Sequence, residues 1–201
     1  WHWFWNYGNG DLGNQGVHQM DVAIWGMNKG LPVRVASMGG RFGYSDQGET
    51  ANTQICTFAY ADGTMLVFEV RGRATNDEGG ARIGNLFYGS NGYMVDGKFF
   101  DKNNKEIPDE KGPGEDITAG GNHYSSFIRA VRSRKPEDNP APALAGHIGS
   151  AHCHLGNIAY RLGATMAFDP ASEQFTGPDA AKANPLLKRE YREGFEVPQL
   201  A

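Results

Sequence analysis

The stretch Thr53-Gln-Ile-Cys-Thr-Phe-Ala-Tyr-Ala-Asp-Gly-Thr-Met-Leu-Val-Phe-Glu-Val-Arg71 decides the fold of this chain. Its two halves are rich in β-branched and aromatic residues, and Ala61-Asp-Gly63 between them is a strong turn signal. This pattern predicts an antiparallel hairpin. Further strands are expected at 33–38, 82–88, 93–95 and 98–100, and the last two are joined by a second Asp-Gly turn.

Helical periodicity appears in three longer segments. The first runs roughly from Asn14 to Met27, the second from His123 to Arg134 behind the capping residue Asn122, and the third from Ala143 to Leu162. A short helix is expected around 180–187. Hairpins backed by a few helices predict an α+β fold, with a largely antiparallel open sheet and helices packed on one face.

Length and composition indicate one soluble domain over residues 1–201, because 39% hydrophobic and 21% charged residues are ordinary globular usage. The polar segment 101–121 is expected to be a mobile loop. A net charge of -4 gives no reason to bind nucleic acid or anionic membrane. No apolar run approaches the roughly 20 residues that a membrane span needs. Cys56 and Cys153 are expected to be buried small hydrophobes, and they leave the compartment undecided.

The most distinctive polar pattern lies in Asp11-Leu-Gly-Asn-Gln-Gly-Val-His-Gln-Met-Asp-Val-Ala23. Asn14, His18 and Asp21 are four and three residues apart, so on a single helix they would share one face. Glycines beside them leave room for a ligand or for another backbone. This pattern is typical of a functional site.

The same stretch carries a family resemblance. Gly10-Asp-Leu-Gly-Asn-Gln-Gly-Val-His-Gln-Met-Asp21 is similar to the Gly-x-x-x-Asp-x-Gly-x-His-x-x-Asp segment of the Gfo/Idh/MocA oxidoreductases, which are named for glucose-fructose oxidoreductase and inositol dehydrogenase. These enzymes oxidise or reduce sugars and cyclitols with NAD or NADP. The segments 68–72, 88–94, 123–134 and 154–163 resemble parts of that family's C-terminal domain, in the expected order.

The resemblance covers only the C-terminal domain of such enzymes. No segment has the Gly-x-Gly-x-x-Gly turn of a dinucleotide-binding βαβ unit, and the family's Glu-Lys-Pro segment with its catalytic lysine is also missing. The chain begins at Trp1 with neither an initiator Met nor a signal peptide, so it is expected to be a fragment or processed form of a longer protein. NAD or NADP is therefore expected on a separate N-terminal dinucleotide-binding domain. The chain alone is expected to be inactive.

The resemblance implies that His18 is a general acid or base at a sugar hydroxyl or carbonyl, whereas the alternative is a structural histidine in the core. Asn14 stands where the family usually has an aspartate, so it is either an orienting group, with Asp11 or Asp21 supplying charge, or a sign that sugar binds without turnover. Asp21 could equally be a structural acid near the start of a helix.

Three more groups complete the candidate list. Trp3 and Trp5, in the aromatic opening Trp1-His-Trp-Phe-Trp5, could stack on sugar rings or belong to an edge strand. Arg71 could reach a polyol, but an ion pair with Glu69 is the commoner outcome. A zinc site is not expected, because the histidines do not converge. The edge of the third helix, which carries His147, Ser150, His154, Asn157 and Arg161, is expected to face solvent or another subunit.

Three functions remain open. The first is the substrate-binding and oligomerisation domain of an NAD(P)-dependent oxidoreductase acting on a sugar or polyol. The second is a keto-sugar lyase or hydratase domain that uses the same histidine. The third is a non-catalytic carbohydrate-binding or assembly domain. Apolar residues on both faces of the central hairpin, Ile55, Phe58, Met65, Val67 and Phe68, predict a homo-oligomer formed through the sheet.

Overall fold

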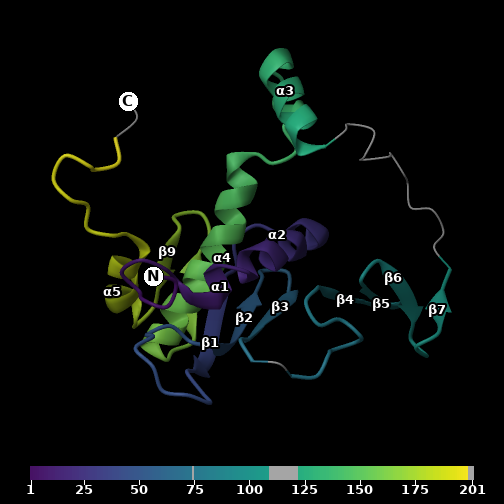
Figure 1. Cartoon of the computed structure of the whole chain (residues 1–201), viewed down its shortest axis with the longest axis horizontal. Helices are drawn as coiled ribbons and strands as arrows, with labels where there is room; N and C mark the ends of the chain where they lie inside the picture. Colours follow the sequence, from purple (N-terminus) through teal and green to yellow (C-terminus); the bar gives the residue numbers. More distant parts are fainter. Residues whose placement is uncertain (74, 109–121, 199–201) are drawn as a thin grey trace.

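The computed structural model describes residues 1–73, 75–108 and 122–198 (Figure 1). Its central sheet has five strands in the order β3-β2-β1-β8-β9, and every neighbouring pair is antiparallel. The strands are β1 (Arg34–Gly40), β2 (Thr53–Ala59), β3 (Met65–Arg71), β8 (Met166–Asp169) and β9 (Gln174–Thr176). The expected α+β class with an antiparallel sheet is therefore confirmed.

Two longer helices lie against this sheet. They are α2 (Gly16–Met27) and α4 (Ala143–Leu162), with the single turn α1 (Gly10–Gly13) before α2. The predicted bounds of α4 are confirmed, and Gly163 ends the helix in the left-handed conformation at φ 62°. Three short helices, α5 (Ala180–Ala183), η2 (Pro136–Asp138) and η3 (Asn184–Leu187), complete the helical content of the described residues, apart from α3.

The central hairpin forms as its sequence predicts. Ile55 pairs with Glu69 and Phe58 with Leu66, and Gly63 takes the left-handed φ of 86° that the turn requires. Because side chains alternate across a strand, this register places Phe58 on the face covered by the helices and Ile55 on the open face.

The core lies between the helices and the inner face of the sheet. Side chains from α1, α2 and α4 meet those of β1, β2 and β3 there, in a single cluster of buried residues. The buried side chains of the strands and helices include Leu12, Met20, Ile24, Val35, Cys56, Phe58, Leu66, Cys153, Leu155 and Ile158. Both cysteines are free and buried, as expected. The helices thus cover one face only.

The opposite face of the sheet is open and partly apolar. Met38 is 81% exposed, and its cross-strand partner Ile55 is 47% exposed. Met65 and Val67 on β3 lie on the same open face and are also mostly exposed. Nothing among the described residues covers this surface.

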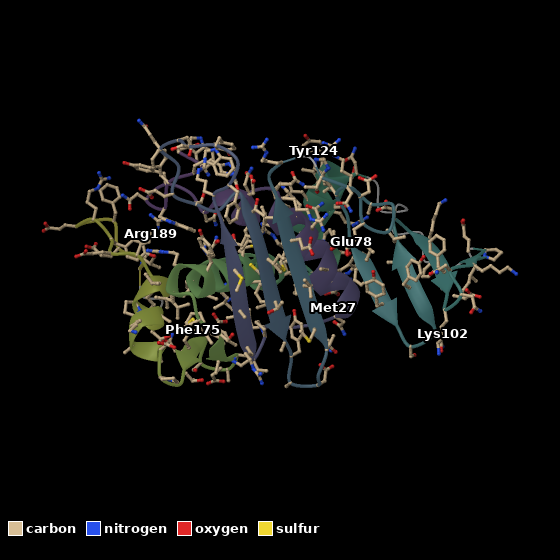
Figure 2. All side chains as sticks on the ribbon, turned by 90° about the horizontal axis from the view of Figure 1, so that it is seen from below. Met27, Glu78, Lys102, Tyr124, Phe175 and Arg189 are labelled. Carbon is tan, nitrogen blue, oxygen red and sulfur yellow. The ribbon has the colours of Figure 1, made fainter. Side chains whose placement is uncertain are left out.

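A second, four-stranded sheet extends beyond the edge of β3 (Figures 1 and 2). It is an antiparallel meander of β4 (Leu86–Gly89), β5 (Gly92–Val95), β6 (Lys98–Asp101) and β7 (Glu106–Ile107). The expected Asp-Gly turn is present, since Asp96 and Gly97 both have positive φ, at 49° and 76°. The predicted loop 101–121 is corrected at its start, where residues 106–107 pair with β6; residues 109–121 lie outside the described part of the chain.

Helix α3 (His123–Ser133) stands away from the main body at the far end of α4 (Figure 1). The side chain of Asn122 accepts hydrogen bonds from the backbone amides of Tyr124 and Ser125, at 3.1 Å each, so the predicted cap is confirmed. Tyr124 and Phe127 on this helix are exposed.

In the C-terminal part, the expected short helix forms as α5 and η3, but the hairpin of β8 and β9 was not predicted.

Candidate functional site

The segment that resembles the family motif breaks into two helices. A single helix from residue 14 was predicted, but Asn14 has the non-helical dihedrals φ -101° and ψ -87°, and α2 starts only at Gly16. Glycine and asparagine are poor helix formers, and they crowd this stretch. Packing also favours glycine at position 16, because a Cβ there would lie 3.1 Å from Phe68 Cζ. His18 and Asp21 therefore share one face of α2, as predicted. Asn14 lies in the link between α1 and α2.

His18 lies in the first turn of α2 and is exposed. Its imidazole makes no hydrogen bond or ion pair with any residue that the structure describes. A structural histidine of the core would be buried and hydrogen-bonded, so this placement argues against the structural alternative. Asn14 and Asp21 are exposed as well. The three side chains are thus available to a ligand or to another domain.

Asp11 was a candidate source of negative charge at the site of Asn14 and His18, but its carboxylate lies against His2. One carboxylate oxygen, Oδ1, lies 3.3 Å from Nε2 of His2. The other oxygen faces the end of β3, where a Cβ at Gly72 would be only 3.0 Å away. Asp11 is therefore held between the N-terminal segment and the sheet. The contact with His2 becomes an ion pair when the imidazole of His2 is protonated.

The aromatic opening is a series of turns, so the edge-strand alternative is wrong. Hydrogen bonds from Phe4 N to the Trp1 carbonyl, and from Gly8 N to the Phe4 carbonyl, coil the segment on itself. The indole of Trp3 packs under the guanidinium of Arg41 at 4.7 Å, and the indole of Trp5 packs under Arg161 at 5.2 Å. Both rings are half-buried, and one face of each is occupied by a cation.

Arg71 forms ion pairs on the open face of the sheet. Its guanidinium contacts the Glu69 carboxylate and lies 3.1 Å from Glu78 Oε2. Glu69 and Arg71 follow Met65 and Val67 on the side of β3 away from the helices. The strand alternation therefore separates Arg71 from His18, whose helix lies on the covered face.

Two polar residues of α4 are buried, and one of them, Asn157, belongs to the edge that was expected to face solvent or another subunit. Asn157 is buried and donates through Nδ2 to the Asn9 carbonyl at 2.9 Å. His152, next to that edge, is fully buried; its Nδ1 lies 2.8 Å from the Ile148 carbonyl and its Nε2 3.0 Å from the Tyr60 hydroxyl. Burial lowers the pKa of His152 to about 4, so the imidazole is neutral. The periodicity identified the helix, but the sheet packed against it buries part of the polar edge.

Neither a dinucleotide-binding unit nor a metal site was predicted on this chain. All described strand pairs are antiparallel, and a dinucleotide-binding βαβ unit needs parallel strands. The described residues therefore contain no βαβ unit of that kind. They also contain no group of three or more His, Cys, Asp or Glu side chains placed to hold a metal ion. No described helix is long and apolar enough to cross a membrane.

Two polar residues near the motif, His2 and Gln54, had no predicted role, and Asn157 was expected at a solvent-facing or subunit-facing edge. His2 and Gln54 come from segments read for their aromatic or strand character, and their polar side chains were given no role. A polar residue at an inward position of a strand, such as Gln54 between Ile55 and Thr53, is the signal that could have identified it.

Comparison with known proteins assigns the family. Residues 1–197 match the model of the oxidoreductase family, C-terminal alpha/beta domain, of the Gfo/Idh/MocA group. The chain belongs to this family. No curated protein sequence matches it significantly.

Solved structures support the fold. The WlbA dehydrogenase from Bordetella pertussis, in complex with NADH and UDP-GlcNAcA, matches 84% of this chain and 48% of its own, at 15% identity and a TM-score of 0.56. A Klebsiella pneumoniae protein described as an oxidoreductase matches 91% of this chain and 53% of its own, also at 15% identity and a TM-score of 0.56. This chain thus spans about half the length of the structures that it matches. At this identity the likeness concerns the fold alone.

Proposed function

We propose that this chain is the substrate-binding domain of an NAD(P)-dependent oxidoreductase that acts on a hydroxyl or carbonyl group of a sugar or polyol. The observation that carries the proposal is the exposed, unpartnered imidazole of His18 within the segment that resembles the family motif. The presence of NADH and a sugar nucleotide in the WlbA structure supports the same substrate class. In this proposal the dinucleotide binds a separate domain, and the antiparallel pairing of the described strands is consistent with that assignment.

In this proposal His18 moves the proton. When a hydroxyl is oxidised, a ring nitrogen of His18 accepts the hydroxyl proton; in the reverse direction the imidazolium returns it to the carbonyl oxygen. Asn14, in the link before α2, donates its amide hydrogens to the substrate or accepts a hydroxyl through its carbonyl. Asp21, one turn further along α2, supplies a negative charge near the imidazole. Asp11, Trp3 and Trp5 remain candidate substrate contacts, although each already has a partner within the chain. Arg71, also predicted as a substrate contact, lies on the open face of the sheet, away from the face that α2 covers.

The test is replacement of His18 by Ala in the protein that carries the dinucleotide-binding domain. Positioned acid or base groups contribute roughly 100- to 10,000-fold in rate, so turnover of the sugar should fall by that order, while sugar binding weakens little. Gln19→Ala, the neighbouring position on α2, is the matched control and should retain turnover. An unchanged rate in His18→Ala would refute the catalytic role. No nicotinamide-dependent turnover of sugars, sugar nucleotides or polyols by the wild type would refute the proposal as a whole.

Asn14→Asp tests the departure from the family pattern. A carboxylate beside the imidazole would stabilise the imidazolium, so the pH optimum of turnover should move upward. Because Asn14 lies outside α2, this result also tests whether its side chain reaches His18. An unmoved pH profile would show that the two side chains act in separate places.

A further inference from the structure

Helix α4 runs alongside the motif segment in the opposite direction. At one end, Nδ2 of Asn157 donates a hydrogen bond to the Asn9 carbonyl at 2.9 Å. One residue back, a Cβ at Gly156 would lie 3.2 Å from Leu12 Cδ2, so α1 packs directly on the helix there. The beginning of the motif segment is therefore held by α4, which is 148 residues away in the chain at the Asn157 bond.

The contact continues along α2. A Cβ at Gly149 would lie 3.6 Å from the Cα of Asp21, two turns of α4 before Asn157. The contacts at Gly149 and Gly156 are van der Waals packing and have no directional preference. The hydrogen bond of Asn157 is directional, and it acts on the residue immediately before α1.

The orientation of the Asn157 amide is itself fixed from the sheet. Nε2 of Gln54 donates to Oδ1 of Asn157 at 3.3 Å and to the Ser37 hydroxyl at 3.0 Å. Because Gln54 presents donors, the oxygen of the Asn157 amide must face it, and the nitrogen must face the Asn9 carbonyl. Gln54 and Asn157 are both buried, so the hydrogen bond between them is shielded from competing water.

Helix α1 depends on such outside support. It has only four residues, and the side chain of Asn9 makes no capping hydrogen bond to it. A helix this short is unstable in isolation. The bonds that hold its start are the one from Asn157 to the Asn9 carbonyl and the one from Gly10 N to the His2 carbonyl at 3.2 Å.

We propose that Asn157 is a positioning residue: its amide, oriented by Gln54, fixes the start of α1 and, through it, the placement of Asn14 and His18. The catalytic meaning of that placement rests on the proposed function. The placement itself can be measured without any substrate, so its failure and the failure of the proposed function are distinguishable.

The experiment is amide hydrogen exchange on the intact chain. Asn157→Leu removes the donor at similar volume, so the Asn9 carbonyl loses its hydrogen bond from α4 and keeps only the intrahelical bond of an N-cap carbonyl. We expect the protection of amides 10–14 to fall by roughly 5- to 100-fold relative to the amides of β2, as the loss of one buried hydrogen bond predicts. The neighbouring Ile158→Ala is the matched control, because it removes core volume without touching Asn9. It should lower the protection of amides throughout the core, with no larger loss at amides 10–14 than elsewhere.

Asn157→Asp keeps the shape and makes the effect dependent on pH. The neutral acid can still accept from Gln54 and donate its hydroxyl to the Asn9 carbonyl, whereas the carboxylate has no hydrogen to donate. Protection of 10–14, relative to wild type at the same pH, should be retained at about pH 5 and lost at about pH 9. This variant also keeps the proposal testable if Asn157→Leu does not fold. Equal losses across the core in Asn157→Leu and Ile158→Ala, or a protection ratio in Asn157→Asp that does not change with pH, would overturn the proposal.

Discussion

The buried imidazole of His152 should make the stability of this protein depend on pH. Burial lowers its pKa from 6.5 to about 4, while its hydrogen bond with the Ile148 carbonyl acts in the opposite direction. In the unfolded chain the imidazole titrates near its ordinary value. Between these two values the unfolded state binds a proton that the folded state does not, so protonation favours unfolding.

The sign and size follow from that difference. The contribution of His152 is fully present above about pH 6.5 and is lost as the pH falls towards about 4. One pKa unit corresponds to about 1.36 kcal/mol, so the free energy of unfolding should decrease by roughly 3 kcal/mol across this window. His154, whose pKa is also lowered by burial and then by Arg189, contributes with the same sign. The effect of His152 must therefore be isolated by substitution.

Urea unfolding followed by circular dichroism, at several pH values between 7 and 4.5, would measure how the free energy of unfolding depends on pH. His152→Gln removes the titrating group and keeps an amide that can bond with the Ile148 carbonyl and the Tyr60 hydroxyl. Its absolute stability should be lower, but its dependence on pH should be flatter than that of the wild type. Tyr60→Phe is the matched control, because it removes the hydroxyl partner and leaves the imidazole buried. Equal pH slopes in the wild type and His152→Gln would refute the assignment of a buried neutral histidine.

Three further predictions concern assembly, packing and cofactor binding. We expect the open face of the sheet to associate, so Val67→Lys should shift the mass measured by light scattering towards the 21.9 kDa of one chain; a wild-type monomer at high concentration would contradict this. Gly156→Ala should lower the free energy of unfolding by about 1–3 kcal/mol, because its Cβ would lie 2.9 Å from Cys56 Sγ. Gly146→Ala, on the same helix in open space, should stabilise by up to ~1 kcal/mol, and similar effects of the two in urea unfolding would contradict the packing argument. Calorimetry should detect no binding of NAD or NADP to this chain alone, and a micromolar complex would contradict the separate cofactor domain.

Local signals in the sequence predicted much of the fold. The turn at Gly63, the cap at Asn122 and the stop at Gly163 are each set by neighbours within a few residues, so the sequence pattern contains what is needed to recognise them. The pairing of β1 with β8 has no such signal. It joins Arg34 with Ala167, residues that become neighbours only after the helices have packed, and β8 itself is short.

The candidate site shows the same difference between features set by neighbouring residues and features set by long-range packing. His18 was singled out because its motif is contiguous, and its helix needs only local information. The roles of Asn157 and His2 depend on which surface each residue meets after folding, which helical periodicity does not specify. Asn157 occupies a polar position on a helix whose polar edge was expected to face solvent, yet Gln54 on the sheet supplies a buried donor to meet it. A buried polar side chain is favourable only when its partners are in place. The hydrogen bond between Gln54 and Asn157 therefore fixes the position of α4 on the sheet more narrowly than apolar contacts would. Through the bond from Asn157 to Asn9, the same constraint reaches the segment that carries Asn14 and His18.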